Sequence, residues 1–253
     1  MGAARAFLSF LLSTVFTEKC LICGAVIHQR RDLPVRLSQA CYDFFSQRHI
    51  FSPLPGVELP ALVMCPSCWL KLSPSFGPDQ PPLRGVPVIA PFRTCRLVLS
   101  LVKYLKYSNG RSAASPLSWW MAEALIRYIR ESGTMDLSEI TLVPVPLHRS
   151  RRRRRGYNQA ELLARKVAAR AGCGVRTDMI FRKKRTRSQA RLAPEERKSN
   201  VAGAFRAAGG RACDGIVLVD DLVTTGETAG ECLRTLDSAG NHVIAVLAAG
   251  TSL

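Results

Sequence analysis

Two adjacent acids, Asp220 and Asp221, follow a buried-type apolar run at Ile216–Val219. Two carboxylates at the end of an apolar strand are costly to bury unless other groups pair with them. At the carboxyl end of a parallel strand, however, side chains project to the edge of the sheet where α/β proteins bind ligands. The type and position of these acids therefore indicate ligand binding rather than packing.

A threonine-rich turn comes directly after the acids and before a helical pattern. Its residues are Thr224, Thr225, Gly226, Glu227 and Thr228. Hydroxyls and free backbone N–H groups at a helix N-terminus form an anion site, and glycine lets the backbone approach a phosphate closely. Carboxylates beside such a turn suit a ribose whose 5-phosphate the turn holds. The Walker A and GxGxxG patterns are absent; a capped helix after two surface acids is the alternative.

Strand and helix patterns alternate through the rest of the chain. Helical spacing of apolar residues covers 94–109, 117–132, 157–172 and 228–240, and β-rich runs cover 140–147, 215–221 and 242–250. This alternation predicts an α/β fold with a mostly parallel sheet. A Pro- and Gly-rich stretch, Ser73–Pro87, is typical of a linker, so we expect an N-terminal section at 1–75 and a larger domain at 88–253.

The chain carries a formal net charge of +17, and nearly all of it lies in one segment. Between Arg149 and Arg211 there are 20 Lys and Arg residues against four acids. Charge so concentrated favours a polyanionic partner, either a nucleic acid or a polyphosphorylated small molecule. The densest run is Arg151, Arg152, Arg153, Arg154 and Arg155, for which we expect non-specific, salt-sensitive binding to single-stranded DNA. A solvated charged face is the alternative.

Four cysteines form two CxxC pairs in the first section: Cys20, Cys23, Cys65 and Cys68. Four thiolates suit Zn²⁺ in a structural, ribbon-like site, although the gap between the pairs is long and Cys41 could replace one ligand. Reduced, buried thiols are the alternative. The N-terminal apolar run is too short to span a bilayer and lacks a cleavage site, so we expect no membrane span and a cytoplasmic protein.

Several motifs in series resemble the ComF family, competence-associated proteins similar to amidophosphoribosyltransferases. They are the Val143–Ala168 segment with its Pro-Val-Pro-Leu and Arg-Gly-Tyr-Asn-Gln runs, the Arg185–Phe205 segment, and the strand, acids and Thr-Thr-Gly turn. The resemblance implies a type I phosphoribosyltransferase-like fold that binds phosphoribosyl pyrophosphate (PRPP) together with Mg²⁺. Glu227 departs from the family pattern, which has a small or apolar residue at that position.

The resemblance also implies roles for particular residues. Asp220 and Asp221 would hold the ribose and serve catalysis, and Thr224–Thr228 would hold the 5-phosphate. His148 and Arg149 would lie in a pyrophosphate loop, and Thr186–Asn200 would form a mobile hood over the ligand. Two hypotheses follow from the resemblance. The protein is a phosphoribosyltransferase with an unidentified acceptor, or it is a non-catalytic component of DNA uptake that senses a ribose phosphate and contacts single-stranded DNA or a competence helicase.

Overall fold

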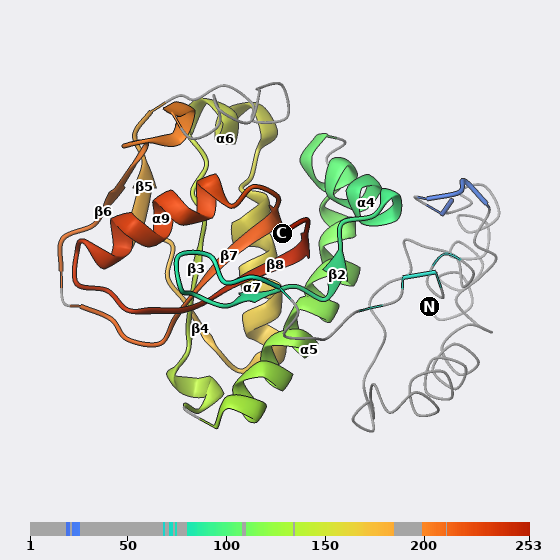
Figure 1. Cartoon of the computed structure of the whole chain (residues 1–253). Coiled ribbons are helices and arrows are strands. Elements are labelled where there is room, and N and C mark those ends of the chain that lie inside the picture. The colour runs from blue at the N-terminus through green and yellow to red at the C-terminus, as the bar shows by residue number, and fades with distance from the viewer. Residues whose placement is uncertain are drawn as a thin grey trace, which may run out of the picture. The chain divides into compact units, whose positions relative to one another are not determined.

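The computed structural model describes residues 19–20, 22–25, 68, 71–72, 74, 80–107, 110–133, 135–184, 199–210 and 212–253. The chain divides into two compact units, Met1–Ser73 and Pro74–Leu253. All the helices and strands named below lie in the second unit (Figure 1). Within the described residues, none of the helices is both long and apolar enough to cross a membrane.

A mostly parallel sheet of six strands forms the centre of the second unit. Its strands are β1 (Val88–Ile89), β2 (Phe92–Arg93), β3 (Thr141–Pro144), β4 (Gly174–Val175), β7 (Ile216–Val223) and β8 (Val243–Thr251). Their order is β1-β8-β7-β3-β4, with β2 also paired to β8, and all these pairs are parallel. The expected α/β class with a mostly parallel sheet is therefore confirmed. A separate antiparallel pair joins β5 (Ile180–Arg182) to β6 (Phe205–Ala207).

Helices cover both faces of this sheet. The described helices of this unit are α4 (Arg96–Tyr107), α5 (Ala114–Ser132), α6 (Arg149–Arg155), α7 (Gln159–Ala171) and α9 (Glu227–Asp237), with the short 3₁₀ turns η1 (Arg111–Ala113) and η2 (Leu137–Glu139). Helices α5 and α7 pack against each other on one face, whereas α9 and the β5–β6 pair lie on the other (Figure 1). Burying an apolar face of α5, α7 and α9 against the sheet is what holds these layers together.

Local sequence explains where the helices begin and end. The Asn158 side chain accepts a hydrogen bond from the Ala160 N–H and so caps α7, as Asn commonly does. Gly172 ends the same helix with φ 77°, in the left-handed region that glycine adopts without strain. The predicted helices and longer strands all appear, because their apolar periodicity matches the faces that they bury.

Two local features differ from the sequence-based expectation. Strand β7 does not end at the acids but continues to Val223, because β8 keeps pairing with it as far as Thr251. In the second half of the predicted linker, Leu83 and Val86 exchange backbone hydrogen bonds of 2.8 and 3.0 Å and close a tight turn. That turn packs on α9 through Leu83, whose Cδ1 lies 2.5 Å from the position that a Cβ on Gly226 would take.

Candidate functional site

Asp220 and Asp221 lie side by side in β7 but face opposite sides of the sheet, since successive strand residues alternate. Asp220 is in phase with Ile216 and Leu218, which belong to the core under α9. Asp221 faces the other side, where Lys106 from α4 reaches it. On the other edge of β7, β3 ends at Pro144 opposite Val219. The acids therefore project beyond the end of β3 while they remain paired with β8.

Asp221 forms an ion pair with Lys106, whose Nζ lies 2.7 Å from Asp221 Oδ1. The Asp221 side chain is 4% exposed and the Lys106 side chain is 25% exposed, so the pair lies at the margin between interior and solvent. The second oxygen, Asp221 Oδ2, is buried and has no hydrogen-bond partner among the described residues. An unsatisfied buried carboxylate oxygen is costly and can accept a hydrogen bond from a ligand hydroxyl.

Asp220 is buried, and its Oδ1 accepts a hydrogen bond of 2.8 Å from the backbone N–H of Asp221. Burial, followed by the neighbouring charge of Asp221, raises the pKa of Asp220 to about 7, against the opposing effects of Lys106 and Arg182. Two adjacent carboxylates do not both ionise easily in a partly desolvated site. Asp220 therefore titrates near neutrality, as groups at functional sites often do.

The predicted phosphate turn follows β7 and leads into α9. Thr224 and Thr225 are exposed, and Gly226 is the residue that precedes the helix, with φ 72° and no side-chain cap. The backbone N–H groups of the first helical turn lack partners within the helix and are available to an anion. Ser252 N–H donates to Val223 C=O at 2.9 Å and fixes the start of the turn. Glu227 and Thr228, both half-buried, begin α9.

The turn after β3 begins at the same edge of the sheet, because Val145 N–H donates to Val219 C=O at 2.8 Å. His148 caps α6: its Nδ1 accepts a hydrogen bond from the Ser150 N–H at 3.2 Å and lies 2.8 Å from Ser150 Oγ. Because Nδ1 acts as an acceptor, Nε2 carries the ring proton. Arg149 is exposed. Both predicted pyrophosphate-loop residues thus follow the strand that neighbours the acids.

The arginine run forms helix α6 and does not act as one unit. Arg155 donates to Gln159 and its guanidinium lies 5.5 Å from the centroid of the Tyr107 ring, in α4. Arg152 forms an ion pair with Glu161 at 3.5 Å. Arg153 and Arg154 are exposed. Part of the run therefore serves packing, and the rest is open to solvent.

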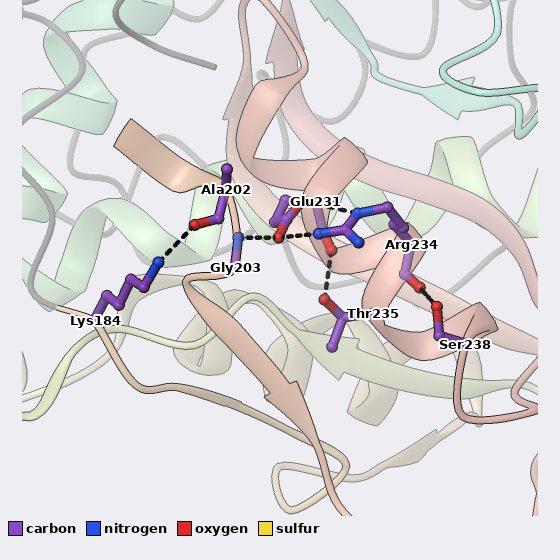
Figure 2. Close-up of polar contacts among 7 residues, drawn as sticks. All are labelled: Lys184, Ala202, Gly203, Glu231, Arg234, Thr235 and Ser238. Carbon is purple, nitrogen blue, oxygen red and sulfur yellow. Dashed lines mark hydrogen bonds and ion pairs between the residues drawn. The ribbon is translucent and has the colours of Figure 1, made fainter. Parts of the chain in front are cut away.

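Most of the expected hood lies outside the described residues, which include only Ser199 and Asn200 of it. The segments on either side of it are held together, as Figure 2 shows: Lys184 Nζ donates to Ala202 C=O at 3.0 Å, and Glu231 of α9 accepts from Gly203 N–H at 2.5 Å. Arg234 donates to the same Glu231 carboxylate at 2.6 and 3.1 Å. The base of this segment is thereby fixed to the helix that begins at the phosphate turn.

Three of the four predicted zinc ligands lie together in the first unit. The Sγ atoms of Cys20, Cys23 and Cys68 are all within 4.8 Å of one another, and Cys65 lies outside the described residues. The turn that carries the first pair is closed by hydrogen bonds from Gly24 N–H to Cys20 C=O and from Cys20 N–H to Ala25 C=O. Thiolates about 2.3 Å from a tetrahedral zinc would be separated by similar distances, so these residues fit the ion.

Lys106 and Arg182 are the site residues that the sequence patterns did not reveal. Lys106 pairs with Asp221, and the charges of Arg182 and Asp220 interact. A signal for Lys106 was present: it follows Val98 and Val102 at four-residue spacing, so it lies on a face of α4 that is otherwise buried. A lysine on an apolar face indicates a buried partner. Arg182 had no comparable signal.

Comparisons with known proteins come from sequence and from structure. DNA utilization protein YhgH of Escherichia coli K12 is 30% identical over 189 residues, which cover 72% of this chain and 82% of that protein. YhgH of Salmonella typhimurium is 32% identical over 192 residues with the same coverage. Competence protein F of Haemophilus influenzae is 32% identical over 156 residues, which cover 58% of this chain and 64% of that protein.

No family model matches the chain. Among solved structures, adenine phosphoribosyltransferase from Leishmania donovani is 15% identical, covers 64% of this chain and 60% of its own, and has a TM-score of 0.30.

Proposed function

The chain belongs to the family of competence protein F and DNA utilization protein YhgH, and from this premise we propose that it binds a ribose 5-phosphate group, such as that of PRPP. The observation that carries the proposal is the continuity of one segment. Within Asp220–Thr228, two acids are followed by the N-terminus of a helix, which Gly226 precedes. One carboxylate oxygen of Asp221 has no hydrogen-bond partner among the described residues. Ribose hydroxyls donate to carboxylates and a phosphate accepts from backbone N–H groups, so this segment complements both ends of one molecule.

The groups around this segment suit the rest of PRPP. His148 and Arg149 follow β3 at the same edge and offer a ring N–H and a guanidinium to a diphosphate. Mg²⁺ would come with that diphosphate, since it is commonly bound through substrate phosphates and one or two carboxylates. Its chemistry would be to neutralise charge on the leaving diphosphate. Asp220 and Asp221 would accept hydrogen bonds from the ribose hydroxyls of the same molecule.

Calorimetric titration with ribose 5-phosphate, ribose and inorganic phosphate tests this proposal. Ribose 5-phosphate should bind most tightly, because only it engages both the acids and the turn. Asp221→Ala should weaken its binding by about 1.5–3 kcal/mol, the loss expected for hydrogen bonds to a charged group. Asp237→Ala, an exposed acid at the end of α9, should bind as wild type does. Equal affinity for all three compounds would contradict the proposal. A screen for pyrophosphate release from PRPP with candidate amines tests catalysis separately.

As a second function, we propose that α6 binds single-stranded DNA, which agrees with the names of the relatives. The protein would then act in DNA uptake in the cytoplasm, either alone or together with a helicase. The observation in its favour is that Arg153 and Arg154 are exposed on one short helix. Each phosphate contact on a single strand contributes roughly −0.7 to the slope of log affinity against log salt. Replacing both with Gln should flatten that slope by about 1.4, whereas Arg127→Gln with Arg130→Gln, both exposed on α5, should not.

We further propose that the first unit holds one structural Zn²⁺ through Cys20, Cys23, Cys65 and Cys68. The proximity of three of these thiols supports it. A zinc tetrathiolate site can supply much of the folding free energy of a small section of chain.

A further inference from the structure

We propose that Lys106 is the counter-ion of Asp220 and Asp221, the carboxylates proposed to bind ribose, and that its charge prevents free divalent cations from binding to them. This inference rests on the proposed function for the role of the acids, but not for the ion pair itself. Lys106 is far from the Asp220–Thr228 segment in sequence, and α4 brings it there. It is therefore a specificity-determining residue of a site whose other members the strand and turn supply.

The geometry gives the first argument. Asp220 and Asp221 are adjacent and buried, and Asp221 Oδ2 has no partner among the described residues. Carboxylate oxygens are ligands that Mg²⁺, Mn²⁺ and Ca²⁺ prefer. The Lys106 ammonium lies 2.7 Å from Asp221 Oδ1 and occupies one side of the carboxylate that such an ion would need. The lysine ammonium balances the charge of the carboxylate as a metal ion would, but it offers no coordination site to a ligand.

The charge state of the lysine gives the second argument. Burial alone would lower the pKa of Lys106, but the charge of Asp221 and the hydrogen bond to it outweigh burial, and the pKa is raised above its ordinary value. The ammonium therefore stays charged at neutral pH. Arg155, whose charge opposes protonation of Lys106, is the cation that faces it from α6. Asp220, in β7, adds to the attraction.

A neutral ligand group can bind where a metal ion is repelled. A ribose hydroxyl can donate to the free Asp221 Oδ2 while Lys106 remains on Oδ1, since a carboxylate accepts several hydrogen bonds. A divalent cation would have to approach within a few ångströms of the ammonium, and like charges at that distance repel strongly in a partly desolvated site. The site therefore selects a sugar hydroxyl over a free metal ion, and Mg²⁺ reaches it only with a ligand that carries its own phosphate oxygens.

Calorimetric titration of the full chain with Mn²⁺ alone, after removal of loosely bound metal, tests the inference. Wild type should bind Mn²⁺ weakly at the second unit, and Lys106→Met should bind it at least tenfold more tightly, because the same carboxylates then lack a cation. Lys106→Arg keeps the charge and should behave as wild type. Lys103→Met is the matched control, an exposed lysine one turn earlier on the same helix. The double variant Lys106→Met with Asp221→Asn should lose the added Mn²⁺ binding.

Ribose 5-phosphate provides the second readout. In EDTA, Lys106→Met should bind it about tenfold more weakly than wild type, and Mn²⁺ should restore the affinity. If Lys106→Met does not fold, Lys106→Gln, which keeps a polar head at this partly exposed position, replaces it in every titration. Unchanged Mn²⁺ affinity in the folded neutral variant overturns the role of Lys106, even if wild type binds ribose 5-phosphate. Increased Mn²⁺ affinity with no sugar-phosphate binding in wild type refutes the proposed function alone.

Discussion

Gly226 offers the sharpest test of the phosphate turn, because its backbone and its surroundings both exclude a side chain. Its φ of 72° lies in the left-handed region, and a Cβ would meet Leu83 Cδ1 at 2.5 Å. The backbone conformation alone should cost alanine about 1–2 kcal/mol. Rotation of Leu83 away from the helix should add about 1 kcal/mol, the lower end of what overpacking costs. Gly226→Ala should therefore lower the free energy of unfolding by about 2–3 kcal/mol.

The same substitution should weaken ligand binding. Either the turn keeps its shape and Leu83 moves, or the turn shifts and its N–H groups no longer point at one phosphate. Loss of one hydrogen bond to a charged group costs about 1.5–3 kcal/mol, which corresponds to roughly a 10- to 150-fold loss of affinity. Urea unfolding measures the first effect, and calorimetric titration with ribose 5-phosphate, under conditions where the variant is folded, measures the second.

Gly172→Ala is the matched control. Gly172 has a similar φ of 77°, follows α7, and has no heavy atom within 4 Å of the position of an added Cβ. This variant should lose about 1–2 kcal/mol of stability through its backbone alone and should bind ribose 5-phosphate as wild type does. If the two folded variants bind ribose 5-phosphate equally well, the Thr224–Thr228 turn is not the phosphate site.

Three further results are expected. The pKa of Asp220, about 7 when folded, lies above its unfolded value near 3.9, so the folded state retains a proton that the unfolded state releases. The free energy of unfolding should thus fall as the pH rises from about 4 to 7, and Asp220→Asn should remove that slope in urea unfolding. Cys68→Ser should lower the zinc content measured by metal analysis, whereas Cys95→Ser, exposed in the second unit, should not. Glu123→Gln should cost about 1–3 kcal/mol in thermal unfolding, because it weakens the 2.7 Å bond from Arg170 to a buried carboxylate.

Much of the fold could be predicted because its signals are local. The alternating apolar patterns located β3, β7, β8 and the four longer helices, since each element buries one face and its spacing records that face. Short strands such as β1 and β4 have only two residues, too few for a periodicity. They pair because β8 and β3 present free edges beside them. Helix α6 was hidden for a related reason: a run of arginines carries no apolar stripe.

The site was predictable where one segment carries it and unpredictable where two segments meet. Acids, threonines and glycine within Asp220–Thr228 could be interpreted together, because a strand followed by a helix fixes their relative positions. Lys106 comes from a helix more than a hundred residues earlier, and only packing brings its ammonium to Asp221. The alternation of the two acids between the faces of β7 was implicit in the strand pattern. Its consequence, that the ammonium of Lys106 forms its ion pair with Asp221, depended on tertiary structure.

The basic segment shows why a count of charges does not by itself define a binding surface. Arg170 is bound by Glu123 and stacks on Trp119, so its charge is committed to holding α7 against α5. Arg155 is packed on Tyr107 in a similar way. Ion pairs at exposed positions contribute little, so Arg152 can exchange Glu161 for a phosphate at small cost. A polyanion should therefore distinguish these arginines by their packing: charge removal at α6's exposed positions weakens DNA binding, whereas removal at Arg170 weakens the fold.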